Sequence, residues 1–246
     1  MAKFYAVAVG KEPGLYDTWD ECKAQVTGFP NAKYKSFDNQ EDALEFLEQS
    51  TDDYSDSTEN DFETYAFVDG SFNSKTNTYG YGGFLIHKHV EEKDNGKKTW
   101  LIDKTIIKGS GNDIELTELR NITGEILGCM EAVKEAIKKK YKTLAIFYDY
   151  AGIEMWATGM WNRNKKATQD YYEFMQSIKD KIDIKFIKVK GHTKIDGNEE
   201  ADRLAKEACG ILETKSEEDS DKIIENAFHD LFDNYFNEES ENNNDL

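Results

Sequence analysis

The hydrophobic and polar positions along the chain form two patterned regions separated by a polar one. Residues 3 to 47 combine short apolar runs typical of strands with two stretches of helical spacing, which predicts a small α+β unit. Thr18 followed by Glu21 is a capping-box pattern, so a helix is expected to begin there. Residues 48 to 63 are polar and aperiodic, as in a flexible linker. We therefore expect a first domain at 1–47 and an acidic linker at 48–63.

From residue 64 onward, the order of the predicted elements defines a fold class. Strands are expected at 64–69, 79–88, 98–109, 143–149 and 182–191, and helices at 123–140, within 151–181 and at 198–209. Turn residues separate the first three strands, which therefore should pair in antiparallel order. The later strands are joined through helices, which implies parallel pairing. The pattern predicts an α/β domain at 64–212 with a mixed five-stranded sheet flanked by helices.

The last segment, residues 213 to 246, is acidic and rich in asparagine, with one apolar stretch inside it. Ile223, Ile224, Ala227, Leu231 and Phe232 give that stretch an apolar face, so an amphipathic helix is expected at 223–236. Such a helix either packs back on the body or serves as a protein-interaction segment. Simple disorder is the third alternative.

The net charge of −18 on 246 residues would argue against nucleic-acid binding if it were evenly spread, because phosphate contacts depend on Lys and Arg. It is concentrated instead in the linker, with −7, and in the tail, with −10. Residues 64 to 212 carry +2. The largest block of the chain is therefore close to neutral, with lysines that could be grouped on one face.

The cysteines and the apolar runs indicate the cellular compartment and the metal chemistry to expect. Cys22, Cys129 and Cys209 have no metal-ligand spacing and are expected to be buried free thiols. No run of about 18 apolar residues is present, and the first residues lack the pattern of a secretory signal. We therefore expect a monomeric cytoplasmic protein without membrane association.

Four carboxylates stand where the pattern predicts a shared site. Asp69 and Asp149 end two buried strands, and the ends of adjacent parallel strands lie together at one edge of a sheet. Glu125 opens the helix after the third strand, and Asp202 borders the buried stripe of the last helix. Like charges held close together require a compensating cation, and carboxylate oxygens suit magnesium or manganese. Taken singly, each is an ordinary turn or helix carboxylate.

The motifs "YAFVDGSF", "GEILGCMEA", "FYDYAGI" and "KVKGHTKIDGNEEADRLA" closely resemble, in this order, those of the type 1 ribonuclease H family. The resemblance covers residues 64 to about 210. It implies a ribonuclease H-like fold and a metal set of Asp69, Glu125, Asp149 and Asp202 that holds two Mg²⁺ ions, with Mn²⁺ as an alternative. It also implies a catalytic role for His192 in proton movement or product release.

Two departures from the family pattern concern substrate contacts rather than chemistry. "RNITGE" keeps Asn121, a nucleic-acid contact by resemblance, but has Ile122 and Thr123 after it, and Tyr150 replaces a common serine. Within 152 to 167, Trp156 and Trp161 accompany basic residues and resemble the family's substrate-handling segment. Each tryptophan either contacts nucleic acid or packs in the core, and we expect one tryptophan in each role.

The first region resembles the hybrid-binding domain found at the start of many type 1 ribonucleases H and in caulimovirus inclusion-body proteins. Trp19, Tyr34 and Lys35 match its aromatic and basic nucleic-acid contacts, whereas Ser36 replaces a second lysine. The missing charge predicts weaker and more salt-sensitive binding.

Together these observations predict a magnesium-dependent endoribonuclease that hydrolyses the RNA strand of RNA-DNA hybrids. One alternative is a hybrid-binding protein without catalysis, which the presence of all four carboxylates disfavours. Another is a DNA nuclease or recombinase of the same fold, which the hybrid-binding resemblance and the histidine segment disfavour.

Overall fold

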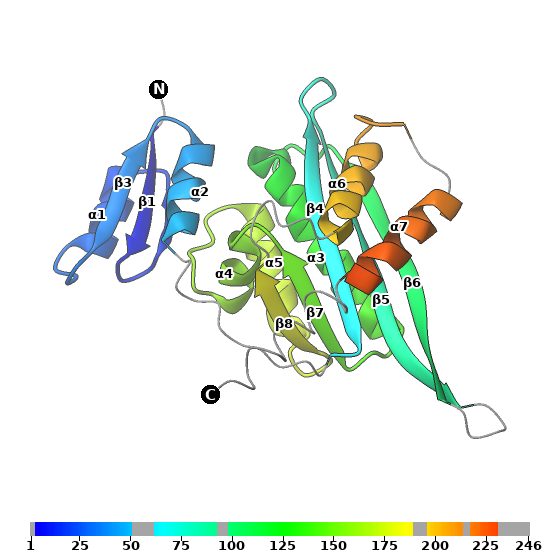
Figure 1. The fold of residues 1–246 in the computed structure, drawn as a ribbon. Coiled ribbons are helices and arrows are strands. Elements are labelled where there is room, and N and C mark those ends of the chain that lie inside the picture. Colours follow the sequence, from blue (N-terminus) through cyan, green and yellow to red (C-terminus); the bar gives the residue numbers. More distant parts are fainter. Residues whose placement is uncertain (1–2, 51–61, 93–97, 189–195, 214–216, 231–246) are drawn as a thin grey trace. The chain divides into compact units, whose positions relative to one another are not determined.

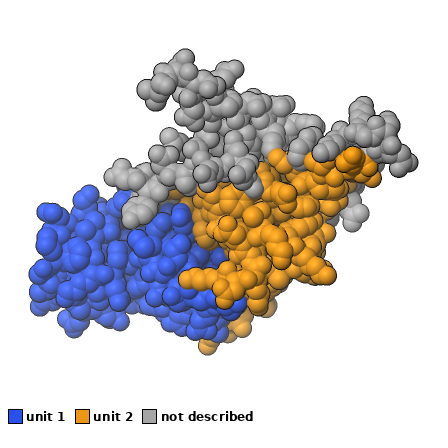
Figure 2. Space-filling model, turned by 90° about the horizontal axis from the view of Figure 1, so that it is seen from below, with its two compact units in different colours: residues 1–57, 150–177 blue, residues 58–149, 178–246 orange. Residues whose placement is uncertain are grey.

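The computed structural model describes residues 3–50, 62–92, 98–188, 196–213 and 217–230. Contacts divide the chain into two compact units, one of residues 1–57 and 150–177 and one of residues 58–149 and 178–246 (Figure 2). No helix in the described ranges is both long and apolar enough to cross a membrane.

The N-terminal part of the first unit is a three-stranded antiparallel sheet with two helices (Figure 1). Its elements are β1 (Phe4–Val9), β2 (Gly14–Tyr16), α1 (Trp19–Val26), β3 (Lys33–Phe37) and α2 (Gln40–Gln49). The strand order is β2-β1-β3, so β2 and β3 are the edges. The predicted capping box is present, because Thr18 Oγ1 accepts from the backbone N–H of Glu21 at 3.3 Å. This confirms the predicted start of α1.

The remainder of the first unit consists of α4 (Gly152–Thr158) and α5 (Lys166–Ser177). The two helices share a core, in which the hydroxyl of buried Tyr171 on α5 donates to the carbonyl of Ile153 on α4 at 3.0 Å. We call residues 159–165, which join them, the α4–α5 loop.

The second unit contains the predicted mixed five-stranded sheet, in the order β6-β5-β4-β7-β8. Its strands are β4 (Thr64–Asn73), β5 (Thr78–Glu92), β6 (Lys98–Gly111), β7 (Thr143–Tyr148) and β8 (Asp183–Lys188). The pairs among β4, β5 and β6 are antiparallel, and those of β4 with β7 and of β7 with β8 are parallel. The predicted fold class is therefore confirmed.

Strand β4 runs further than the sequence pattern predicts. A strand ending at Asp69 was expected, yet β4 continues to Asn73, because its antiparallel pairing with β5 extends over its whole length. Its parallel pairing with β7 ends at Phe67 opposite Phe147. Asp69 therefore lies within a strand, just beyond the point where one of the two neighbours stops pairing.

Helices cover both faces of this sheet. They are η1 (Thr117–Leu119), α3 (Asn121–Lys138), α6 (Asp196–Ala208) and α7 (Glu217–Asp230). Paired residues on adjacent strands face the same side, so the Asp69–Gly82 pair shares one face and the Gly70–Tyr81 pair the other. A Cβ on Gly82 would collide with α6, and a Cβ on Gly70 would collide with α3. The two helices therefore pack on opposite faces.

The core on the α6 face is aromatic. The ring of Phe67 stacks against that of Phe147, with centroids 4.7 Å apart, and against that of Phe84 at 5.2 Å. Ile224 of α7 is fully buried in the same cluster, beside Leu204 of α6. The tail helix therefore packs back on the body, although it begins at Glu217 rather than at the expected residue 223.

A buried ion-pair network joins α6 to α7. Arg203 pairs with Glu200 and Glu207 on its own helix and donates to Ser220 Oγ of α7 at 2.8 Å. On the adjoining strand, Lys104 Nζ lies 2.8 Å from Glu225 Oε1. Charged residues of the tail thereby contribute to packing, as its apolar residues do. Cys22, Cys129 and Cys209 are buried free thiols, as predicted.

Candidate active site

Asp69 and Asp149 lie side by side because of strand register. Phe67 is opposite Phe147 in the parallel pair, and each carboxylate follows two residues later. Asp69 is partly buried, whereas Asp149 is exposed just beyond the end of β7. Burial raises the pKa of Asp69, and the negative charge of Asp149 raises it further, as expected for two neighbouring carboxylates. The predicted pairing of these two residues is thus present in the fold.

Glu125 reaches the same part of the sheet from the α3 side. Gly70 lets the first turn of α3 approach the strand closely, since a Cβ there would collide with the Asn121 carbonyl and the Glu125 amide. Glu125 is 5% exposed, and the side-chain amide of Asn121 donates to its Oε1 at 3.5 Å. The small residue after Asp69 therefore lets the backbone of Glu125 lie close to β4.

Asp202 stands on α6, the helix that packs on the face to which Asp69 points. Its charge also raises the pKa of Asp69, so it belongs to the same electrostatic cluster. Lys206, one turn further along α6, lies 2.6 Å from Asp202 Oδ2. Both side chains are 40% exposed. Lys206 is a site residue that we did not predict, although its i+4 spacing from Asp202 was a visible signal.

Burial and the neighbouring carboxylates together disfavour negative charge on Asp69. Burial, followed by the charge of Asp149, raises the pKa of Asp69 from 3.8 to about 7, and Asp202 adds to this effect. The backbone N–H of Gly70, 2.6 Å from Asp69 Oδ1, and the Lys206 ammonium act in the opposite direction. The site therefore has an excess of negative charge that a cation would compensate.

The donor chemistry of this cluster fits magnesium. All four predicted ligands supply carboxylate oxygen, which hard divalent cations prefer. As they stand, the described residues include no set of three or more His, Cys, Asp or Glu side chains arranged to hold a metal ion. The structure thus brings together the charges of Asp69, Asp149 and Asp202, with Glu125 beside the same strand. His192 lies outside the described residues.

The predicted nucleic-acid contacts of the N-terminal domain form an exposed aromatic patch, made of Tyr5, Trp19 and Tyr34. Trp19 is 42% exposed and Tyr34 46% exposed, and the centroid of the Trp19 ring lies 5.9 Å from that of each neighbour. Lys35, also exposed, extends over the ring of Phe37 at 5.0 Å. Lys35 follows Tyr34 on β3 and therefore points to the other face of the sheet. Tyr5 is a member of the patch that the sequence prediction missed.

The expectation that one of the two tryptophans contacts nucleic acid is corrected by their burial. Trp156 is 4% and Trp161 3% exposed, and their rings pack edge to face with centroids 5.7 Å apart. Tyr150 packs against both. Both indoles are therefore core anchors of the first unit, because the three aromatic residues bury one another.

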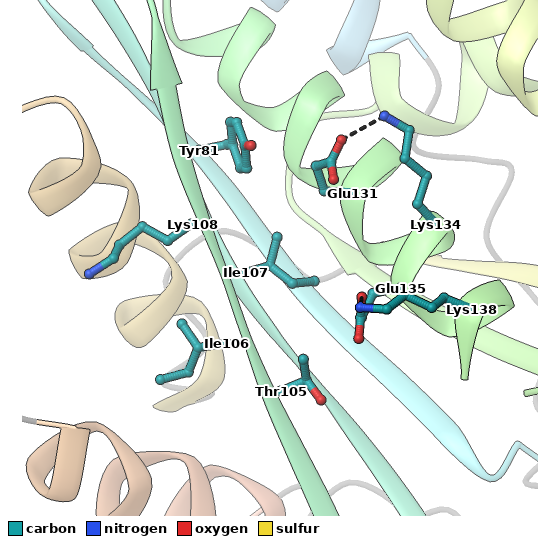
Figure 3. A pocket seen from close by; sticks show the side chains of 9 residues that line it. All are labelled: Tyr81, Thr105, Ile106, Ile107, Lys108, Glu131, Lys134, Glu135 and Lys138. Carbon is teal, nitrogen blue, oxygen red and sulfur yellow. Dashed lines mark hydrogen bonds and ion pairs between the residues drawn. The ribbon is translucent and has the colours of Figure 1, made fainter. Parts of the chain in front are cut away.

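A separate pocket lies between the β5–β6 pair and α3 (Figure 3). Its α3 wall carries Lys134, 2.6 Å from Glu131, and Lys138, 2.9 Å from Glu135. None of the four carboxylates lines it. The pocket thus lies outside the carboxylate cluster, and its paired α3 charges favour no particular ligand.

With the sheet order and the carboxylate cluster established, comparison with known proteins gives the class. The sequence model described as RNase H matches residues 61–210, more than half of the chain, and the chain belongs to the RNase H family. A second model, described as the ribonuclease H1 N-terminal domain, matches residues 3–47. Both regions together characterise a type 1 ribonuclease H.

The chain is also similar to individual known proteins. The chain is 25% identical to human ribonuclease H1 over 255 residues, which cover 84% of this chain and 89% of the human protein. It is 51% identical over 60 residues to ribonuclease H of Saccharomyces cerevisiae, covering 24% and 17% of the two chains. The solved structure of RNase H1 from Halobacterium salinarum is 19% identical, covers 61% of this chain and 98% of its own, and has a TM-score of 0.41.

Proposed function

We propose that the protein hydrolyses the RNA strand of RNA-DNA hybrids as an endoribonuclease. The observation that carries this proposal is the cluster of Asp69, Asp149 and Asp202, in which burial and the neighbouring negative charges raise the pKa of Asp69 on the sheet of an RNase H family member. A site with this excess of negative charge is suited to cations and, through them, to phosphate.

Four side chains would hold two magnesium ions, or manganese in their place. Asp69, anchored within β4, would hold the ions together with Glu125, Asp149 and Asp202. When bound, the ions supply an activated water and stabilise the leaving 3′ oxygen of a phosphodiester. Gly70 keeps Glu125 close to β4, and Lys206 neutralises part of the cluster before metal arrives.

The remaining predicted residues serve the substrate. Trp19 and Tyr34 form an exposed surface on which a base can stack, and Lys35 adds a cation on the same edge strand, so the N-terminal domain would tether the hybrid and raise its effective concentration. Asn121, exposed at the start of α3, would contact the substrate next to Glu125. His192 would move protons or assist product release.

One assay tests this function. The protein is incubated with a labelled RNA-DNA hybrid, duplex RNA and duplex DNA, with magnesium or with chelator, beside the Asp149→Asn variant. We expect magnesium-dependent cleavage of the RNA strand of the hybrid alone, abolished in Asp149→Asn. Hybrid binding without cleavage would identify a binding protein, and equal cleavage of duplex DNA would identify a DNA nuclease.

A further inference from the structure

The α4–α5 loop covers the open edge of the small N-terminal sheet. Edge strand β2 has backbone groups that no other strand pairs, and such edges are usually protected. The backbone N–H of Asn162 donates to the Pro13 carbonyl at 2.8 Å. The side-chain amides of Asn162 and Asn164 donate to the Leu15 carbonyl at 2.8 and 2.9 Å. The loop therefore covers the edge of β2 with one backbone and two side-chain hydrogen bonds.

An ion pair adds to this contact. Lys165 Nζ lies 3.0 Å from Asp17 Oδ2, and the Lys165 side chain is only 19% exposed. Gly14 makes the approach possible, because a Cβ there would collide with the Asn162 side chain, and its φ of +145° also favours glycine. Backbone and side-chain groups of residues 13 to 17 thus form a docking surface that is complementary to the loop.

We propose that the N-terminal domain docks through this surface on the α4–α5 loop, and that phosphates of a bound nucleic acid compete with Asp17 for Lys165. The competition rests on the proposed function, whereas the docking does not. Docking and nucleic-acid contact by Lys165 then exclude each other, so the domain leaves the loop when substrate arrives.

The contact is built to be reversible. It contains three hydrogen bonds and one partly exposed ion pair, which salt and competing anions weaken. Among the described residues, Asn162 Oδ1 is buried without a hydrogen-bond partner, which opposes the gain from the other bonds. Undocking would hydrate this oxygen and release Lys165.

Distance measurements on the full chain test the docking. Spin labels are attached at Lys23→Cys on α1 and Glu173→Cys on α5, which are both exposed helical positions, whereas the three natural cysteines are buried. Without nucleic acid we expect one narrow distance distribution. The distribution should broaden in Asn162→Ala and in Lys165→Asp. Adding Asp17→Lys to Lys165→Asp exchanges the two charges and should make the distribution narrow again. A broad distribution in the otherwise unmodified chain would overturn the docking.

Hybrid binding in chelator, where RNA is not cut, tests the competition. Saturating hybrid should broaden the distribution. Asp17→Asn should lower the Kd for hybrid about two- to tenfold because Lys165 no longer has to be released, and Asp20→Asn, an equal charge change outside the contact, should lower it less. A narrow distribution at saturation, or equal effects of the two variants, would overturn the competition. If the protein does not bind hybrid at all, both the competition and the proposed function are wrong. The docking is tested separately, in the measurements without nucleic acid.

Discussion

The ammonium group of Lys206 lies 2.6 Å from Oδ2 of Asp202, one helical turn away, where it offsets part of the negative charge around Asp69. Under the proposed metal site, this ammonium competes with magnesium for the same carboxylate. The Lys206→Gln variant should therefore bind Mg²⁺ about two- to fivefold more tightly, as expected for a half-exposed pair worth less than about 1 kcal/mol.

Calorimetric titration with magnesium, without substrate, measures this effect. Lys134→Gln is the matched control, because Lys134 pairs with Glu131 on α3 and does not affect the pKa of Asp69. Unchanged or weaker magnesium binding in Lys206→Gln would contradict the prediction.

The pKa of Asp69 predicts how the stability of the metal-free protein depends on pH. In the folded chain this carboxyl ionises near pH 7, against about 3.9 in an unfolded chain. Between these values the unfolded chain has lost the proton that the folded chain keeps, so the free energy of unfolding falls as the pH rises from about 4 to about 7. The loss is complete above that range and amounts to no more than about 4 kcal/mol.

The Asp69→Asn variant lacks this loss. Urea unfolding in chelator measures this. Between pH 4 and pH 8 the stability of Asp69→Asn should rise relative to that of the natural chain. Asp183→Asn, at the exposed start of β8, is the control and should show no such rise. Magnesium should reduce the difference at pH 8. A difference that does not change with pH would count against the charge cluster.

Gly70 offers a steric test of how Glu125 is positioned. Alanine at residue 70 would force its Cβ into the first turn of α3, at the Asn121 carbonyl and the Glu125 amide. We expect Gly70→Ala to lose about 1–3 kcal/mol of stability by overpacking and to lose most hybrid cleavage, measured at saturating magnesium.

Gly128→Ala is the control on the same helix. Its Cβ would lie 3.4 Å from the Tyr81 Cβ, close to an ordinary contact distance, so the change should be neutral or stabilise by up to about 1 kcal/mol. Equal losses of activity in both variants would show that Gly70 has no special role in placing Glu125.

The aromatic patch of the N-terminal domain predicts a loss of affinity without a loss of chemistry. Trp19→Ala removes the central ring between Tyr5 and Tyr34, so hybrid binding should weaken by about 1–3 kcal/mol, the effect of one stacked base. Fluorescence anisotropy in chelator measures it. Phe29→Ala, another exposed aromatic of this domain, should bind normally, and cleavage at saturating hybrid should be unchanged in both.

The fold class and the grouping of charges could be predicted because they depend on periodic patterns and strand register. Asp69 and Asp149 each follow an apolar run, and parallel pairing placed them together. The extension of β4 to Asn73 was missed because its last residues lack a clear strand pattern and are held by pairing with β5.

Features that depend on tertiary packing could not be predicted. The spacing of Trp156 and Trp161 does not distinguish a core anchor from a stacking surface, because burial depends on how the segment folds and on Tyr150 packing against both rings. The hydrogen bonds between Asn162 and the edge of β2 join residues about 150 positions apart. Such contacts follow from tertiary packing rather than from any repeat in the sequence.

Helix α7 places a limit on where this protein can be shortened. The match to the RNase H family ends at residue 210, yet Ile224 is fully buried against the aromatic residues that support β4. A truncation at the family boundary would remove this isoleucine and leave an apolar face of the sheet open to self-association. Helix α7 thus completes the apolar core of a domain whose family match ends before it.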